Sequence, residues 1–242
     1  MKNRIREIEE QIAELKSRLP AHSLQPRMFQ ELEDLETELD NLKAKVNIKI
    51  HKFNPQQMEK LDNPKRYIVL PPEEVIRLIP IDQGMKLADI GCAIGYFTFP
   101  LAKALGESGT VFGLDISEEM LLEARKRYEK LIDTKIASVE FLISEENKLP
   151  FLPNTLDVAF VANVLHETED KFEFLSEVAR VLRPGGRLII VEWAKEVMEM
   201  GPPVNKRLSL DEVIGYLKSS GFELVLHQEV GKGHYMIIAV TT

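Results

Sequence analysis

Hydrophobic and polar positions follow two different rhythms along the chain, and these divide it into two parts. In the first 46 residues, apolar side chains recur every three or four positions, which is typical of helices with one narrow apolar face. Pro20 and Pro26 separate two such stretches and favour a helical hairpin over residues 1–46. The apolar positions are Ile5, Ile8, Ile12, Leu15 and Leu19 in the first stretch and Leu32, Leu35, Leu39, Leu42 and Val46 in the second.

Neither apolar face of this hairpin is wide enough to form a core by itself. Each face must therefore pack against the other helix, a second copy of the chain or the remainder of the protein. We interpret residues 1–46 as a structural or dimerisation element resembling a short coiled coil, and a docking site for another protein or a substrate-delivery arm is the alternative. Residues 47–71 contain three prolines and are interpreted as a linker.

From residue 72 onward, short apolar runs alternate with amphipathic stretches, which predicts an α/β fold with a parallel sheet. The last two predicted strands have no helix between them and are joined around Gly231 and Gly233, so we expect an antiparallel hairpin at the end of the sheet. The predicted helices lie near residues 72–79, 96–105, 117–131, 170–182 and 209–220, and the predicted strands near 86–91, 110–115, 138–143, 156–162, 187–193, 223–229 and 234–241.

Two predicted helices begin with recognisable capping residues. Ser117 follows the second strand as an N-cap. Ser209 and Glu212 have the spacing of a capping box, and the flanking Leu208 and Val213 have that of a hydrophobic staple. These local signals support the helix starts near residues 117 and 209.

A turn with two glycines follows the first predicted strand. Gly91 and Gly95 let the backbone turn sharply and approach a ligand closely. A dinucleotide-binding fingerprint that began at Gly91 would require glycine at positions 93 and 96, where this chain has Ala93 and Tyr96. The spacing therefore argues against a nicotinamide dinucleotide as the ligand.

Two acidic residues flank this turn and indicate the charge of the ligand. Asp89, at the carboxyl end of the first strand, is expected to point into the ligand crevice, where it would repel a pyrophosphate and attract an ammonium group. Asp115 ends the second strand, in the position that suits the hydroxyl groups of a ribose. Together they favour a cationic nucleoside.

The turn and several later segments resemble the class I S-adenosylmethionine-dependent methyltransferases, in particular the small-molecule branch that includes ubiquinone/menaquinone-type enzymes. The resemblance implies a Rossmann-like, seven-stranded, mostly parallel sheet with an antiparallel terminal hairpin over residues 72–242. It also implies S-adenosylmethionine as methyl donor, S-adenosylhomocysteine as product and a small-molecule acceptor. The later segments are residues 144–151, 156–167, 178–192 and 221–223.

The resemblance also implies a set of cofactor contacts. Ile116 is expected to cover the adenine face, Ser144 and Glu145 occupy the place of an acidic residue that faces the adenine amine, and Asn163 frames the methionine end through its backbone. Ala93 stands where the family more often has glycine, so binding is expected to be weaker or repositioned at most. The expected cofactor-binding residues are Asp89, Gly91, Cys92, Ala93, Gly95, Asp115, Ile116, Ser144, Glu145 and Asn163.

His166 and Glu167 are the candidate catalytic residues, because they follow the fourth strand where donor and acceptor should meet. A neutral imidazole is a suitable base near pH 7, and a histidine packed against the following helix is the alternative. Glu192 and Trp193 end the fifth strand and could orient or stack on a substrate, although Trp193 could equally belong to the core. By resemblance, part of residues 47–71 folds over the active site as a lid.

Composition narrows the remaining classes. The net charge of −8 argues against non-specific nucleic-acid binding. A single cysteine, Cys92, excludes an internal disulfide and a cysteine-based zinc site and fits a cytoplasmic location, and we expect no metal. No apolar run is long enough to span a membrane. A nicotinamide-dependent oxidoreductase and a non-catalytic binding protein remain as alternative functions, and homodimerisation through residues 1–46 is the expected self-association.

Overall fold

The computed structural model describes residues 55–131, 135–198 and 200–242, together with the single positions 8, 11, 12 and 35. The chain divides into two compact units, Met1–Lys52 and Phe53–Thr242. The predicted hairpin over residues 1–46 lies, apart from those four positions, outside the described residues and stays a prediction. None of the described helices is long and apolar enough to cross a membrane.

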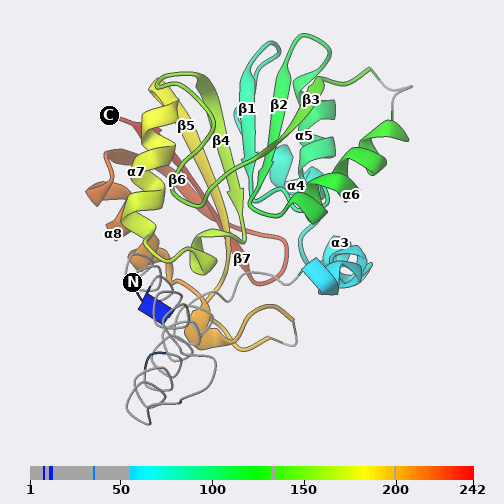
Figure 1. Cartoon of the computed structure of the whole chain (residues 1–242). Helices are drawn as coiled ribbons and strands as arrows, with labels where there is room; N and C mark the ends of the chain where they lie inside the picture. The colour runs from blue at the N-terminus through cyan, green and yellow to red at the C-terminus, as the bar shows by residue number, and fades with distance from the viewer. Residues whose placement is uncertain (1–7, 9–10, 13–34, 36–54, 132–134, 199) are drawn as a thin grey trace, which may run out of the picture. The chain divides into compact units, whose positions relative to one another are not determined.

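A seven-stranded sheet forms the centre of the second unit (Figure 1), in the order β3-β2-β1-β4-β5-β7-β6. All neighbouring strands run parallel except β7, which is antiparallel to both β5 and β6. The predicted mostly parallel sheet with a terminal hairpin is therefore confirmed. The strands are β1 (Lys86–Ile90), β2 (Thr110–Asp115), β3 (Ser138–Ile143), β4 (Leu156–Ala162), β5 (Leu182–Trp193), β6 (Phe222–Val230) and β7 (His234–Thr241).

Helices cover both faces of the sheet (Figure 1). On one face lie α4 (Pro72–Ile76), α5 (Thr98–Leu105) and α6 (Glu118–Glu129), and on the other lie α7 (Lys171–Val181) and α8 (Leu210–Ser219). Successive residues of a strand point to opposite faces. In β5, for example, Leu188 and Ile190 enter the core under α7 and α8, whereas Ile189 and Val191 enter the core under α4 and α5.

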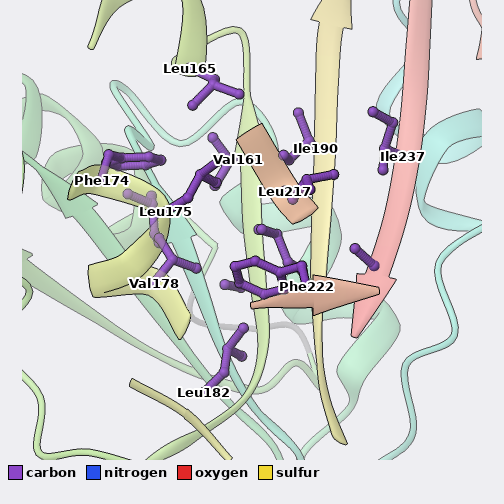
Figure 2. Packing of buried hydrophobic residues seen from close by; sticks show 14 of the residues in the cluster. Val161, Leu165, Phe174, Leu175, Val178, Leu182, Ile190, Leu217, Phe222 and Ile237 are labelled. Atoms are coloured by element: carbon purple, nitrogen blue, oxygen red, sulfur yellow. The ribbon is translucent and has the colours of Figure 1, made fainter. Parts of the chain in front are cut away.

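Figure 2 shows the core on the α7 and α8 side. Leu175 and Val178 from α7, Leu217 from α8 and Phe222 from β6 gather over the central strands, and all four are buried. The cluster closes one face of the sheet with aliphatic and aromatic side chains. The polar residues at the strand ends lie outside this cluster and are available to form a site.

The predicted capping residues act as expected. The Ser117 hydroxyl accepts a hydrogen bond from the Met120 amide at the start of α6, and Ser209 and Glu212 form a reciprocal capping box on α8. The fifth strand differs from the prediction, because it begins at Leu182 and includes Pro184, Gly185 and Gly186, whereas the predicted strand begins near residue 187. Its pairing with β4 shifts register there, and Gly185 takes a φ of +72°.

The segment interpreted as a linker is largely helical in its described part. It contains a 3₁₀ helix, η1 (Pro55–Asp62), and a short α-helix, α3 (Lys65–Val69). The Arg127 guanidinium donates to both carboxylate oxygens of Asp62, at 2.6 and 2.7 Å, and so ties η1 to α6. The three prolines of this segment lie at helix starts: Pro55 begins η1, Pro64 precedes α3 and Pro71 precedes α4. Proline fits the first turn of a helix and disrupts its interior.

Candidate active site

The carboxyl ends of the five parallel strands meet at one edge of the sheet, which is where open α/β sheets bind ligands. The turn after β1 lies at this edge. The amides of Gly91 and Cys92 both donate to the Leu114 carbonyl at 2.8 Å, which holds the turn against the end of β2. Gly91 and Gly95 adopt φ values of +77° and +90°, so both predicted glycine positions use a backbone conformation that favours glycine.

Space as well as conformation requires glycine at these positions. A Cβ added to Gly91 would lie 2.3 Å from Cγ2 of Val164, in the loop after β4, and one added to Gly95 would lie 2.5 Å from the Phe99 ring. The turn is therefore packed closely against the loop after β4, which brings the glycine turn and the segment of residues 156–167 together. Ala93, between the two glycines, also has a positive φ, of +48°.

Asp115 connects three parts of this edge. Its Oδ2 accepts a hydrogen bond from the Ala93 amide and its Oδ1 accepts one from the Ser117 amide, both at 2.9 Å. Its backbone carbonyl accepts from the Ser144 amide at 3.0 Å. Both oxygens of this strand-end carboxylate are hydrogen-bond acceptors, which is the chemistry that ribose hydroxyl groups require. The neighbouring Ile116 is 44% exposed, as a residue that covers a ligand ring would be.

Asp89 is more enclosed than the sequence suggests. The residue is only 2% exposed, and it accepts a hydrogen bond of 2.6 Å from the hydroxyl of Thr98, at the start of α5. Burial raises the pKa of this carboxyl to about 7, although the Thr98 hydrogen bond favours the charged form. The expected direct contact with a ligand therefore stays a prediction. A cation bound nearby would favour the ionised carboxylate.

Cys92 is buried, and burial raises the pKa of its thiol well above the ordinary value. Its side chain packs with Leu121 and Phe141, which agrees with a small packed residue and not a nucleophile. Any cofactor contact from Cys92 would come from its backbone. At the next strand end, Ser144 is half-buried, whereas Glu145 is exposed and bridges to Lys148 through the backbone.

Asn163 directly follows β4 and has a φ of +58°. Its amide donates to the Val191 carbonyl at 2.8 Å, and its Nδ2 lies 3.5 Å from Nε2 of His234. Its Oδ1 is enclosed and has no hydrogen-bond partner among the described residues. An enclosed amide oxygen without a partner costs free energy, and a contact of Asn163 with a ligand stays a prediction.

His166 lies in a 3₁₀ turn, η2 (Leu165–Glu167), close to the end of β5. Its Nδ1 is 2.8 Å from Oε2 of Glu192, and its backbone amide donates to Oε1 of the same carboxylate at 3.2 Å. Its Nε2 is 3.8 Å from Oε1 of Glu167. The structure thus brings both predicted catalytic residues together with Glu192, which sequence reasoning named only as a possible substrate-orienting residue.

A second cluster, which the sequence analysis did not assemble, surrounds Trp193. The Trp193 ring lies 3.9 Å from the His234 ring, and the Arg207 guanidinium carbon lies 5.1 Å from the indole. Arg207 is buried and donates to the carbonyls of four residues of the segment that follows β5: Ala194, Glu196, Met200 and Pro202. Arg207 therefore holds this segment at the edge of the site. Its only sequence signal was position, shortly before the capping box of α8.

Part of the segment predicted as a lid also lies at this edge. The Tyr96 hydroxyl donates to the Leu70 carbonyl at 2.8 Å, and the Arg66 guanidinium stacks 4.0 Å above the Tyr96 ring. The Lys232 amide in the β6–β7 turn donates to the Val69 carbonyl at 2.6 Å. These contacts anchor α3 beside the glycine turn and the terminal hairpin, and the prediction that part of residues 47–71 forms a lid stays a prediction.

The strand order, the antiparallel terminal hairpin and the glycine turn bound by Asp115 define the fold of the class I S-adenosylmethionine-dependent methyltransferases. A sequence profile of the ubiE/COQ5 methyltransferase family matches residues 27–203. This chain belongs to the ubiE/COQ5 methyltransferase family.

Individual relatives agree with this assignment. The demethylmenaquinone methyltransferase of Bacillus cereus (strain ATCC 10987 / NRS 248) is 35% identical over 126 residues, which is 52% of this chain and 52% of that protein. The chain thus matches about half the length of such curated relatives. The crystal structure of a SAM-dependent methyltransferase from Aquifex aeolicus is 36% identical, covers 79% of this chain and 100% of its own, and has a TM-score of 0.74.

A more distant structure shows the likeness of the fold alone. Magnesium protoporphyrin IX methyltransferase from Synechocystis PCC 6803, crystallised with bound SAM, is 21% identical, covers 66% of this chain and 71% of its own, and has a TM-score of 0.53.

Proposed function

We propose that this chain transfers the methyl group of S-adenosylmethionine to a small-molecule acceptor. The observation that carries the proposal is the turn from Gly91 to Gly95: its first two amides donate to the Leu114 carbonyl at the end of β2, and Asp115 accepts from the Ala93 amide. A close-approach turn beside a strand-end carboxylate fits a nucleoside. When bound, S-adenosylmethionine supplies a methyl group that is already reactive on a positively charged sulfur, so the protein mainly aligns the acceptor and excludes water.

Individual roles follow from the positions of the side chains. We propose that Asp115 accepts hydrogen bonds from the ribose hydroxyls, that Ile116 covers the adenine, and that Ser144 and Glu145 approach the adenine amine. Gly91, Cys92, Ala93 and Gly95 would contact the ligand through their backbone, and Asp89 would favour a cation through its buried carboxyl. Asn163 would frame the methionine part through its backbone, at the end of β4.

The acceptor proposal rests on the relatives. Those at 33–35% identity carry the name demethylmenaquinone methyltransferase, and this supports a quinol-type acceptor. A nucleic-acid acceptor is disfavoured by the net charge of −8.

Calorimetry tests the donor and turnover tests the acceptor. The protein is titrated separately with S-adenosylmethionine, S-adenosylhomocysteine and NAD, and we expect binding of the first two only. Formation of S-adenosylhomocysteine is then measured with reduced 1,4-naphthoquinone, catechol, benzylamine and thiophenol, with turnover expected for the first. Tight binding of NAD without binding of S-adenosylmethionine would reject the proposal. Binding without turnover of any acceptor would favour a non-catalytic sensor.

We also propose that residues 1–46 mediate homodimerisation, on the basis of their two apolar faces, and that the protein works in the cytoplasm, where its single buried thiol would stay reduced. Deletion of residues 1–46 should lower the mass in light scattering to that of a monomer and leave the affinity for S-adenosylhomocysteine unchanged. An unchanged mass would argue against the dimerisation role.

A further inference from the structure

His166 and Glu192 form a buried pair at the carboxyl edge of the sheet. Glu192, at the end of β5, has no exposed area, and only 6% of the His166 side chain is exposed. Both oxygens of the carboxylate contact the same residue, one the ring Nδ1 at 2.8 Å and the other the backbone amide at 3.2 Å. Glu192 therefore fixes the position and the rotation of the imidazole.

This contact also decides which ring nitrogen carries the lone pair. A carboxylate oxygen accepts a hydrogen bond from a ring N–H, so we assign the proton of the neutral ring to Nδ1 and the lone pair to Nε2. Oε1 of Glu167 lies 3.8 Å from Nε2, which is beyond hydrogen-bond distance.

A ligand would have to approach His166 from its Nε2 side. The His166 side chain keeps 6% of its area exposed, and Nε2 is not among the enclosed, unpartnered polar atoms of the described part of the chain, which are Asn147 Oδ1, Asn163 Oδ1 and Ser220 Oγ. His166 lies two residues after Val164, whose side chain packs against Gly91 of the glycine turn. The ring therefore follows closely on the turn that we propose for the cofactor.

The charges around His166 favour a proton on the ring. Burial acts most strongly and lowers the pKa of His166, but the attraction and hydrogen bond of Glu192, with the attraction of Glu167, outweigh it and raise the pKa above its usual value. Lys171 at the start of α7 opposes this weakly. On β7, burial lowers the pKa of His234 to about 4, so that ring is neutral near pH 7, and the Tyr235 hydroxyl is engaged with the Leu208 carbonyl.

We infer that His166 is the general base of this methyltransferase and that Glu192 is its positioning residue, so that the acceptor is a molecule that loses a hydroxyl proton during methylation. The inference rests on the proposed function. The acceptor forms a bond to the methyl carbon. The bond from that carbon to sulfur breaks, and its electron pair goes to sulfur. The proton of the acceptor's hydroxyl group moves to Nε2 of His166. The resulting imidazolium is stabilised by Glu192 and later returns the proton to solvent.

The test compares the pH dependence of variants. Turnover of reduced 1,4-naphthoquinone at saturating S-adenosylmethionine is measured across pH 5.5–9 for the wild type, His166→Gln, Glu192→Gln and the control His227→Gln, a histidine exposed on β6. The base must be neutral to accept a proton. The wild-type rate should therefore decrease on the acid side of the His166 pKa, which lies above its usual value. His166→Gln should lower kcat by about 10²–10⁴-fold and remove this acid limb.

Glu192→Gln separates the positioning role from a purely structural one. Loss of the negative charge should move the acid limb to lower pH as well as lower kcat, while His227→Gln should leave the profile unchanged. All three variants should bind S-adenosylhomocysteine with wild-type affinity, measured by calorimetry, and unfold at a temperature near that of the wild type. An acid limb that persists in His166→Gln overturns the inference and leaves the proposed function intact. Absence of S-adenosylmethionine binding by the wild type would instead reject the proposed function.

A second measurement needs no turnover. Nitrogen-15 NMR of the histidines in the complex with S-adenosylhomocysteine should show His166 protonated on Nδ1, with a pKa that Glu192→Gln lowers. Protonation on Nε2, or a pKa that does not respond to Glu192→Gln, overturns the inference even if none of the acceptors is methylated.

Discussion

Asp115 holds Ala93 in a left-handed backbone conformation: its Oδ2 accepts a 2.9 Å hydrogen bond from the amide of Ala93, whose φ is +48°. The other carboxylate oxygen accepts from the Ser117 amide at the start of α6. One side chain therefore shapes the glycine turn and caps the next helix at the same time. The residue that we propose for the ribose also organises the turn beside it.

Ala93→Gly should increase the free energy of unfolding. A left-handed φ costs alanine roughly 1–2 kcal/mol and costs glycine nothing, but glycine loses more entropy on folding, so we expect a net gain of about 0.5–1 kcal/mol. Urea denaturation measures it. The matched control is Ala102→Gly in α5, a buried helical alanine, which should have the opposite sign. A loss of stability in Ala93→Gly would mean that the methyl group contributes packing that outweighs the strain.

Gly91→Ala and Gly185→Ala separate steric conflict from backbone strain. The two glycines have similar φ values of +77° and +72°, but a Cβ meets Val164 at Gly91 and nothing within 4 Å at Gly185. We expect a loss of about 1 kcal/mol for Gly185→Ala and about 2–4 kcal/mol for Gly91→Ala. Adding Val164→Ala to Gly91→Ala should recover part of the difference, because it removes the clash and not the strain. Equal losses for the two single variants would refute the steric account.

Asp115→Ala should weaken the binding of S-adenosylhomocysteine by about 1–3 kcal/mol, or roughly 5–150-fold, because charge-assisted hydrogen bonds to the ribose are lost. It should also lower stability, since the amides of Ala93 and Ser117 lose their acceptor. Calorimetry gives the affinity and urea denaturation the stability, with the exposed Asp211→Ala as control. Reduced stability with unchanged affinity would assign Asp115 to the turn alone.

The stability of the ligand-free protein should fall between pH 4 and pH 7 because of Asp89. The carboxyl has its usual pKa of 3.8 in the unfolded chain and a pKa of about 7 in the fold. Between these values the unfolded state has released a proton that the folded state still holds, so rising pH favours unfolding, by up to about 4 kcal/mol across the window. Asp89→Asn keeps an acceptor for Thr98 and should flatten this slope. The variant should be more stable than the wild type at pH 8 and similar to it at pH 4, and a parallel pH dependence of the two proteins would contradict the assignment.

Local features were predictable because they depend on residues close together in the chain. The caps at Ser117 and Ser209, the glycines of the turn after β1 and the antiparallel hairpin around Gly231 and Gly233 match the structure closely. The helices η1 and α3 were missed, because their stability depends on contacts such as Asp62 with Arg127 on α6. Short helices with prolines nearby have no strong signal of their own.

The sequence by itself determined the order of strands and helices along the chain, the burial of the sheet on both faces, and the glycine turn that identifies the family. These features follow from periodicity and glycine placement, which are local properties. Only the tertiary structure decided which distant polar groups meet. His166 and Glu192 are 26 residues apart and become partners because α7 returns the chain so that β5 lies parallel to β4. Asp89 likewise reads as a ligand contact in the sequence, but packing under Thr98 encloses it. Burial and pairing of side chains depend on how strands align, and no local pattern encodes that alignment.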